Sequence, residues 1–474
     1  MKRLDILVLH GIRDLSRERQ TSINHLFALE RYTSGHRFVY HFIADQTTDA
    51  LKSIPFDVIV LDVTFLCWRW GRPRELFDAV RQDYKWIGTH GALVAAFPQD
   101  DYDHSLILDE WLVELNTGLL FTVYETHRDA LYPNLIARGT PLVGALTGYI
   151  DEDDIGVFLE RRIAFREREI DVSYRVRRLP VNFGRFGRLK SEFGRAFALA
   201  AAGRFVCDIS DDPKDALYGS QWPGLLGNSR FVLGAEGGSS VIDRNGEIRL
   251  RIEEYLATRP DAEFEEIATA CLRPEDESKT FAVISPRLFE IAMAGACPIL
   301  LEGAYNGLIQ PNLHYIPVKR DFSNIEDVVE RLADLDAAEQ MAKQFEEAIL
   351  GNPSLRYQTW IPGIMEVFGA HIEARRHGDQ RAGALSDREF SVLREQHQSA
   401  VRLRLAREIA EVSEKLRLLG NEAQSQRLRL ESENQRLESE NRRLAETASK
   451  SFQARLRRLL GRVRATALPR RASE

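Results

Sequence analysis

The sequence lacks the features of several protein classes. Its 474 residues include only four cysteines, which lie far apart with no CxxC pair: Cys67, Cys207, Cys271 and Cys297. Neither a disulfide framework nor a zinc site is indicated, and a reducing cytoplasm fits best. No stretch approaches the roughly 20 apolar residues that span a bilayer. The apolar run near the N-terminus is also shorter than a signal-peptide core. The sequence therefore predicts a cytoplasmic protein.

Strong charge of either sign is also missing. The formal net charge is −7, and this mild acidity argues against nucleic acid as the main partner. With 44% hydrophobic residues, the chain is apolar enough, and long enough, to build two cores rather than one.

Two successive series of short β-branched apolar runs alternate with helical stretches. The runs lie at 4–9, 38–43, 57–62, 92–97, 118–123 and 141–144, and then at 171–176, 205–209, 231–234, 281–284, 298–301 and 315–318. Such alternation is typical of parallel sheets covered on both faces. We expect an α/β protein with two Rossmann-like domains, 1–165 and 166–375, that face a cleft at the carboxyl ends of their strands.

The composition changes after the second domain. Small and charged residues at 376–389 predict a linker, and 390–450 is almost free of Gly and Pro. Leucine and asparagine each recur every seven residues, at Leu430, Leu437, Leu444, Asn434 and Asn441. Leucine at d and asparagine at a favour a parallel coiled coil and a homo-oligomer. The stripe fails upstream at Gly420 and Arg427, so a single solvated helix is the alternative.

The last segment, 451–474, is rich in arginine. Phe452, Leu456, Leu459, Leu460 and Val463 would share one face of a helix there. Basic amphipathic helices can lie on anionic membranes, which predicts peripheral contact with the inner face of the membrane. A disordered basic tail is the alternative.

The stretch SPRLFEIAMAGACPILLE, 285–302, is the most informative motif. Ser285 and Pro286 suit the start of a helix, and Gly295 suits its end. A helix N-terminus beside a cleft offers free N–H groups to a diphosphate, and Arg287 could add a forked donor. Glu290 could accept hydrogen bonds from ribose hydroxyls. The alternative is a surface helix with an ordinary stop signal.

This motif resembles the donor-site helix of GT-B glycosyltransferases. Upstream, NSRFVLGAEGG at 228–238 resembles the strand and loop before this helix in exostosin-like and spore-maturation-type transferases. With HYIPVKRDFSN at 314–324, the spacing is similar to that of bacterial cell-surface-polysaccharide glycosyltransferases. The resemblance covers about residues 171–350, with a weaker match at FPQDDYDH, 97–104.

The resemblance implies a nucleoside-diphosphate sugar held by the second domain and a glycan or glycolipid acceptor held by the first. The sugar nucleotide would be a substrate, with no separate cofactor and no metal. Large retaining families use two glutamates eight positions apart. Glu290 matches the second of these, whereas Ala282 stands at the first, which leaves the stereochemistry open.

Two further stretches could serve the donor. Arg185, Arg188 and Lys190 follow the first strand of the second domain, where the family places cations on the leaving diphosphate. Their alternative is a solvated basic linker. Glu236 and Gly237 lie in the loop GAEGGSS, which could cradle a phosphate or be a plain turn between strand and helix.

An inverting reaction needs a general base. Asp101 and His104 follow the strand at 92–97, and we expect one of them to take this role, although turn chemistry also explains them. His10, Glu125 and His127 are weaker candidates at other strand ends. The expected function is sugar transfer in cell-surface polysaccharide synthesis. A non-catalytic scaffold and a sugar-nucleotide epimerase are the rivals.

Overall fold

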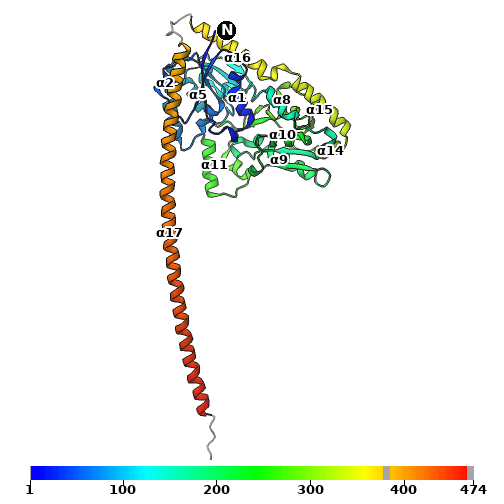
Figure 1. Ribbon diagram of the computed structural model, residues 1–474. Helices are drawn as coiled ribbons and strands as arrows, with labels where there is room; N and C mark the ends of the chain where they lie inside the picture. Colours follow the sequence, from blue (N-terminus) through cyan, green and yellow to red (C-terminus); the bar gives the residue numbers. More distant parts are fainter. Residues whose placement is uncertain (1, 275, 377–384, 467–474) are drawn as a thin grey trace, which may run out of the picture. The chain divides into compact units, whose positions relative to one another are not determined.

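The computed structural model describes residues 2–274, 276–376 and 385–466. The chain divides into two compact units, Met1–His397 and Gln398–Glu474. The first unit contains two parallel sheets with their covering helices, and the second continues a long helix that begins in the first (Figure 1).

The first sheet has six strands in the order β2-β1-β3-β4-β5-β6, and every neighbouring pair is parallel. They are β1 (Asp5–His10), β2 (Arg37–Phe42), β3 (Val58–Leu61), β4 (Leu93–Ala96), β5 (Thr117–Thr122) and β6 (Leu142–Gly144). The helices around them are α1 (Gln20–Arg31), α2 (Asp49–Lys52), α3 (Val63–Leu66), α4 (Arg74–Asp83), α5 (Ser105–Glu114), α6 (Arg128–Leu131), α7 (Pro133–Ala137) and α8 (Glu152–Leu159).

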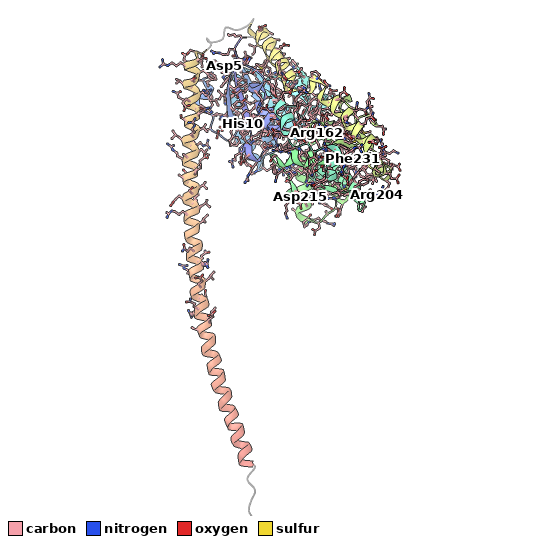
Figure 2. The ribbon with its side chains drawn as sticks, turned by 45° about the vertical axis from the view of Figure 1, so that its right-hand side comes forward. Asp5, His10, Arg162, Arg204, Asp215 and Phe231 are labelled. Carbon is pink, nitrogen blue, oxygen red and sulfur yellow. The ribbon has the colours of Figure 1, made fainter. Side chains whose placement is uncertain are left out.

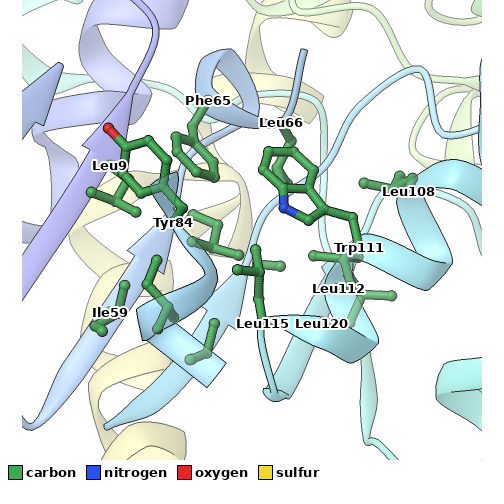
Figure 3. Close-up of a cluster of buried hydrophobic side chains, with 14 of the residues drawn as sticks. Leu9, Ile59, Phe65, Leu66, Tyr84, Leu108, Trp111, Leu112, Leu115 and Leu120 are labelled. Carbon is green, nitrogen blue, oxygen red and sulfur yellow. The ribbon is translucent and has the colours of Figure 1, made fainter. Parts of the chain in front are cut away.

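The central strands of this sheet are apolar on both faces. Leu7 and Ile59 point into one cluster, while Ile6 and Val58 point into another, as the two-residue period of a strand requires. In the first cluster Trp111 of α5 packs on Phe65 with its ring centroid 5.1 Å away (Figure 3). Burial on both faces explains why these strands read as continuous apolar runs.

The second sheet has five parallel strands in the order β13-β12-β9-β7-β8. They are β7 (Ile170–Arg175), β8 (Cys207–Ser210), β9 (Ser229–Gly234), β12 (Cys297–Leu301) and β13 (Ile316–Val318). The helices of this region are α9 (Gly184–Ala200), α10 (Gln221–Gly227), α11 (Glu247–Thr258), α12 (Phe264–Cys271), α13 (Arg287–Ala294), α14 (Ile325–Arg331) and α15 (Leu335–Leu350). The prediction of two Rossmann-like α/β sheets is confirmed.

One expected strand of the second sheet lies elsewhere. The run at 281–284 forms β11 (Phe281–Val283), which pairs antiparallel with β10 (Gly237–Ser239) in a separate two-stranded ribbon. The loop GAEGGSS is therefore half strand rather than a turn into a helix. Gly238 has φ 116° there, and a Cβ at this position would meet the Phe281 carbonyl oxygen at 1.6 Å. Only glycine fits this approach.

The chain crosses between the two sheets twice. α16 (Tyr357–Arg376), which the sequence placed in the second domain, packs on the first sheet through Ile361, Ile364 and Phe368. Phe158 of α8, in turn, belongs to the core beside the second sheet. Trp360 stacks on Tyr149 with the ring centroids 4.0 Å apart, next to the connection between the domains.

Single-turn 3₁₀ segments complete the connections. They are η1 (Leu15–Arg17), η2 (Cys67–Trp70), η3 (Lys85–Thr89), η4 (Phe165–Glu167), η5 (Val181–Phe183), η6 (Pro213–Asp215), η7 (Tyr305–Gly307) and η8 (Pro353–Leu355).

The long helix α17 (Asp387–Thr466) starts on the first sheet. Phe390 is buried, and the Arg37 guanidinium lies 4.1 Å from the centre of its ring. At His397 the imidazole Nε2 is 3.2 Å from His41 Nδ1, and its Nδ1 is 3.0 Å from Thr48 Oγ1. Both imidazoles are buried. These contacts anchor the first three turns of α17 to the first unit.

The structure bears on the expected C-terminal segments only in part. Residues 390–450 are helical, as predicted, while pairing into a coiled coil stays a prediction. In the predicted linker 376–389, residues 377–384 lie outside the described residues, as do residues 467–474 of the predicted basic tail. No helix among the residues that the structure describes is both long and apolar enough to cross a membrane.

The anchor of α17 predicts a pH dependence of stability. Burial lowers the pKa of His41 to about 3, with the neighbouring His397 and His10 adding to this, and burial also lowers the pKa of His397. Both imidazoles are neutral when folded but protonate in the unfolded chain below its ordinary pKa, so stability is lost as the pH falls below about 6.5. We expect His41 to contribute a loss of about 1.4 kcal/mol per pH unit between pH 6 and 4, and His397 to add to this loss as the pH falls.

Chemical denaturation of wild type and His397→Gln at pH 4 to 7 measures this slope. The variant should show a shallower dependence, because it removes one of the two titrating groups. His371→Gln, in α16, is the matched control and should leave the slope unchanged. Equal slopes in all three proteins would contradict the assignment.

Candidate functional site

Both sheets reverse their strand order at an equivalent place. The connections from β1 and β3 run to opposite sides, as do those from β7 and β9, which makes two topological switch points. Ligands of open parallel sheets bind at the carboxyl ends of the strands at such points. In the first sheet this end carries His10, which Figure 2 labels together with Asp5 at the other end of β1.

The carboxyl ends of the first sheet contact the second domain. Asp103, after β4, forms a parallel bridge with Asp243 and accepts a hydrogen bond of 2.6 Å from Arg249. Thr147, after β6, donates a 2.5 Å hydrogen bond from Oγ1 to the Ile284 carbonyl oxygen. The loops that follow the strands of the first sheet therefore form a seam with the second domain.

The predicted donor helix α13 begins at this seam. Pro286 already has helical dihedral angles, and Ser285 Oγ accepts from the Arg287 N–H at 3.4 Å, so the expected helix start is present. A Cβ on Gly148 of the first domain would lie 3.3 Å from the Pro286 ring. At the other end Gly295 adopts the left-handed conformation, with φ 57°. The helix ends where the sequence predicts.

Glu290 and Arg287 lie on the first turns of α13. Burial raises the pKa of Glu290, and the neighbouring Arg287, Trp222 and Arg19 oppose this rise. The Arg287 guanidinium lies 5.3 Å from the Tyr174 ring centre and 5.4 Å from that of Trp222. Its buried Nε has no hydrogen-bond partner in the described structure. Glu290 is thus held among groups of both domains and does not point to bulk solvent.

Lys190 of α9 faces the same seam. Burial, together with repulsion from Arg287 and Arg19, lowers its pKa to about 8, while Asp100 acts in the opposite direction. A Cβ on Gly237 would lie 3.9 Å from Lys190 Nζ. The ammonium forms no hydrogen bond or ion pair with the part of the chain that the structure describes.

Lys190, Arg287 and Glu290 from the second domain therefore lie within electrostatic reach of Arg19 and Asp100 from the first. Arg19 follows β1 and Asp100 follows β4, both at carboxyl ends of the sheet. Within the described part of the chain Lys190 and Arg287 form no salt bridge, and the pKa of the Glu290 carboxyl is raised. The cluster is therefore suitable for an anionic, hydroxylated ligand.

Glu236, in the same region, contacts Tyr305 and Arg320. Its side chain is buried and accepts a 2.8 Å hydrogen bond from the Tyr305 N–H, and its Oε2 lies 3.8 Å from Arg320. It lines a small cavity together with Lys190 and Phe186. Glu236 therefore holds the loop after β12 beside a cavity that Lys190 also lines.

Arg185 and Arg188 do not join this cluster. Arg185 pairs with Glu277 and, at 3.0 Å, with Glu265. Arg188 pairs with Glu192 and lies 4.3 Å from the Phe264 ring centre. Arg185 and Arg188 are three residues apart and therefore share a face of α9, which packs on α12 and its flanking loop. Lys190 lies two residues after Arg188 and therefore on another face of the helix.

The two predicted bases lie inside the protein. Asp101 is 1% exposed, and its Oδ2 accepts from Thr122 at 2.9 Å and from the Tyr132 hydroxyl. Burial raises the pKa of Asp101 to about 6. His104, 5% exposed, contacts Asp103 at 2.7 Å, and a Cβ on Gly246 would meet its Nε2 at 2.2 Å. Both side chains are thus enclosed by packing in this conformation, and a role of either as the base stays a prediction.

A histidine–aspartate pair, missed from the sequence, lies at the first switch point. His25 Nδ1 is 3.1 Å from Asp62 Oδ2, and Asp62 Oδ1 accepts from the Thr64 N–H at 2.8 Å. Burial alone would raise the pKa of Asp62, but the hydrogen bonds with His25 and Thr64 outweigh it and lower the pKa. The aromatic rings of Phe97 and Trp360 flank the imidazole. In the sequence, only Asp62 indicated this pair, as an acidic residue directly after β3.

His10 lies next to this pair. Burial lowers its pKa, and Asp62 and the Ile12 backbone oppose this shift. His10, a weaker candidate for the base in the sequence, is therefore close to the pair of His25 and Asp62. Its buried Nδ1 has no hydrogen-bond partner in the described structure.

Two other features lie outside the cluster. Within residues 2–274, 276–376 and 385–466, no group of three His, Cys, Asp or Glu side chains is arranged to hold a metal ion. A groove of about 430 Å³ lies at the interdomain connection and α15, with Arg162, Arg168 and Lys343 among its lining. None of the predicted site residues lines it.

No protein-family model and no curated protein matches the sequence. Among solved structures, an α-glucosyltransferase with UDP-glucose and DNA containing an abasic site matches at 10% identity and a TM-score of 0.46, over 78% of this chain and 100% of that one.

An Anabaena protein, HepE, with UDP-glucose matches at 10% identity and a TM-score of 0.44, over 78% and 100% of the two chains. Trehalose-6-phosphate synthase from Burkholderia multivorans matches at 11% and 0.42, over 81% and 100%. All three TM-scores are below 0.5, so these similarities do not define a family for this chain.

The seam carries a carboxyl whose charge destabilises the fold. Burial and the nearby Asp151 raise the pKa of Asp154 to about 6, and Glu290 adds to this. The Asn24 amide donates to it at 2.6 Å. Because its folded pKa is raised, ionisation costs stability above about pH 6, and the cost vanishes toward pH 4. We expect Asp154→Asn to raise the free energy of unfolding by about 1–2 kcal/mol at pH 7.5.

Denaturation at pH 7.5 and pH 4.5 tests this, with exposed Asp153→Asn as a control of equal charge change. The gain from Asp154→Asn should shrink at the lower pH, and the control should change little at either. A gain that is independent of pH would mean that removal of charge is not its cause.

Proposed function

We propose that this chain is a GT-B-type glycosyltransferase that transfers a sugar from a nucleoside-diphosphate sugar to a glycan or glycolipid acceptor. The observation that carries the proposal is the convergence of Lys190, Arg287 and Glu290 at the seam. The cluster lies at the switch point of the second sheet, where parallel α/β sheets bind their ligands.

The donor would bind against the second domain. Its diphosphate would lie near Lys190 and the first turn of α13, where the positive end of the helix dipole and free N–H groups favour an anion. Arg287 would supply a further donor through its unpartnered Nε. Glu290 would accept hydrogen bonds from the vicinal hydroxyls of the ribose.

These cations would also act in the chemical step. When the bond between the sugar and the diphosphate breaks, negative charge builds up on the leaving nucleotide. Positive groups fixed at that position stabilise the transition state more than the ground state. We propose this role for Lys190 first, because its ammonium forms no ion pair with any described residue. Arg185 and Arg188 would take part only if they left their carboxylate partners.

We propose His25 as the base that accepts the proton of the acceptor hydroxyl. Asp62 binds one ring nitrogen and would leave the other for the substrate. The pair stands at the switch point of the first domain, where the acceptor is expected. We prefer His25 to Asp101 and His104, which are 1% and 5% exposed.

A role in cell-surface polysaccharide synthesis rests on the sequence resemblance alone, as do independence from metal and peripheral membrane contact of the basic tail. A non-catalytic scaffold is the competing function. Donor turnover separates the two, because a scaffold would bind partners without releasing nucleotide.

Binding of nucleoside diphosphates tests the donor site. Calorimetry with UDP, GDP, CDP, ADP and dTDP should find at least one ligand, and Lys190→Ala should weaken that ligand about tenfold or more, since it removes a charged hydrogen bond worth roughly 1.5–3 kcal/mol. Because the free ammonium has a pKa of about 8, affinity should fall as the pH rises beyond 8 in the wild type.

The exposed Lys214→Ala is the matched control and should leave affinity unchanged. Glu290→Gln should reduce the preference for a ribonucleotide over its 2′-deoxy form. If no nucleotide binds, or if Lys190→Ala and Lys214→Ala behave alike, the proposed donor site is wrong.

Turnover tests the proposed base. With a donor and acceptor in hand, His25→Ala should lower kcat by about 10²–10⁴-fold, because it removes general base catalysis. Nucleotide affinity should be unchanged, since His25 belongs to the other domain. His127→Ala, at the end of β5, serves as the control. An unchanged kcat in His25→Ala would exclude this histidine as the base.

A further inference from the structure

The groove beside α15 is not explained by the proposed enzymatic site. Its volume of about 430 Å³ lies within the range of about 300–1,000 Å³ that is typical of small-molecule sites. The lining combines apolar and basic side chains. They include Leu159, Ile163 and Phe165 on the one hand, and Arg162, Arg168 and Lys343 on the other.

The apolar part of the lining has an exposed and a buried portion. Leu159, the last residue of α8, is 53% exposed, whereas Phe165 is 8% and Ala342 is 3% exposed. An apolar molecule in the groove would remove the Leu159 side chain from water and rest on side chains that are already buried. Such burial is favourable in proportion to the apolar area that leaves water.

Arg168 brings an unusual charge to the same groove. It is 1% exposed, and its guanidinium donates to the carbonyl oxygens of Ile163, Ser229 and Ala294 at 3.0, 2.7 and 2.8 Å. A guanidinium has five N–H donors, so these three hydrogen bonds leave one N–H on each terminal nitrogen for another acceptor. Neutral carbonyls do not cancel the charge, and Arg168 forms no salt bridge with a residue that the structure describes.

The other cations of the groove already have carboxylate partners. Arg162 binds both carboxylate oxygens of Glu346, at 2.8 and 2.7 Å, and Lys343 Nζ is 3.1 Å from Glu339 Oε1. Burial lowers the pKa of Arg168 to about 10, and repulsion from Arg162 adds to this, whereas Glu346 acts in the opposite direction. The positive charge of Arg168 is therefore only partly compensated, and a buried charge is stabilised by a partner of opposite sign.

The groove lies at the opposite end of α13 from the proposed donor cluster. Arg168 donates to Ala294, the last residue of this helix, and a Cβ on Gly295 would collide with the guanidinium of Arg162, which Figure 2 labels. The donor cluster includes Arg287, the first residue of α13. Eight helical residues are about 12 Å long, so a ligand of the groove is distinct from the sugar nucleotide.

We propose that this groove binds a small organic anion, namely a carboxylate or sulfonate on an apolar body. The acid group would accept hydrogen bonds from the two remaining N–H groups of Arg168, because a guanidinium suits both oxygens of one acid group. The apolar body would lie against Leu159, Ile163 and Phe165. An inorganic anion would leave Leu159 exposed and most of the groove unfilled, so an anion with an apolar body fits better.

Fluorescence titration of the full-length chain with 8-anilinonaphthalene-1-sulfonate tests the proposal, because this probe carries one sulfonate on an aromatic body. We expect one saturable site in the groove. Leu159→Asp should weaken it about tenfold or more, because this change replaces an apolar contact by a negative charge. Val157→Asp is the matched control: Val157 is 39% exposed on the same helix and does not line the groove, so the wild-type affinity should be kept.

A second comparison tests the role of charge without altering the buried Arg168. Lys343→Glu should weaken the binding of the sulfonate probe several-fold. The uncharged N-phenyl-1-naphthylamine should bind about tenfold less tightly than the sulfonate, and Lys343→Glu should not affect its affinity. Lys190→Ala should leave the binding of the sulfonate unchanged, because Lys190 belongs to the donor cluster. This outcome separates the groove from the proposed donor site.

Four results would each overturn the proposal. They are the absence of a saturable site in the wild type, equal affinities of Leu159→Asp and Val157→Asp, equally tight binding of the uncharged probe, and loss of the site in Lys190→Ala. Circular dichroism of each variant establishes that it is folded, so that a loss of binding reports on the groove. The measurement does not depend on nucleotide binding or turnover.

Discussion

The reversal of strand order within each parallel sheet is the constraint on which the rest of the structure depends. All strands of a sheet run in one direction, so the loops that follow them gather at one edge. At the reversal the flanking connections diverge and leave room between them. The first sheet places Asp62 there, and the second places the segments that carry Lys190 and Glu236. Contacts such as that of Thr147 with Ile284 hold the two edges against each other.

The charge distribution where the two domains meet differs from that elsewhere in the first unit. Arg185 and Arg188 each have a carboxylate partner, and such pairs contribute to packing without leaving charge for a ligand. Lys190 forms no ion pair with the residues that the structure describes, and burial lowers its pKa. On the other side of the site, burial raises the pKa of Glu290. A fold that keeps both groups desolvated and incompletely paired gives up stability at this place, which is typical of binding sites.

The fold was largely predictable from the sequence, while the site was only partly so. Strands buried on both faces are continuous apolar runs, so the strands of the two parallel sheets could be read directly, whereas β11 was expected in the second sheet and β10 was not expected as a strand. The start and end of α13 follow from Ser285, Pro286 and Gly295. The burial of Asp101 and His104 could not be predicted from the sequence. It depends on the direction of the turn, which Asp100 and His104 set with positive φ angles of 52° and 58°. The pair of His25 and Asp62 joins residues 37 apart, and only the packing of α1 on the sheet brings them together.

A change of burial along α17 shows how one helix can have two roles. Phe390 and His397 are almost fully buried, whereas Leu405 and Ile409, within four turns after His397, are more than half exposed. Helix propensity cannot account for this, because both parts are helical. The difference lies in the spacing of the apolar residues. The anchored part fits the surface of the first sheet, and the next part follows a period of 3.5, which matches another helix rather than a sheet. The exposed stripe of that period leaves apolar side chains in water along about two heptads of α17.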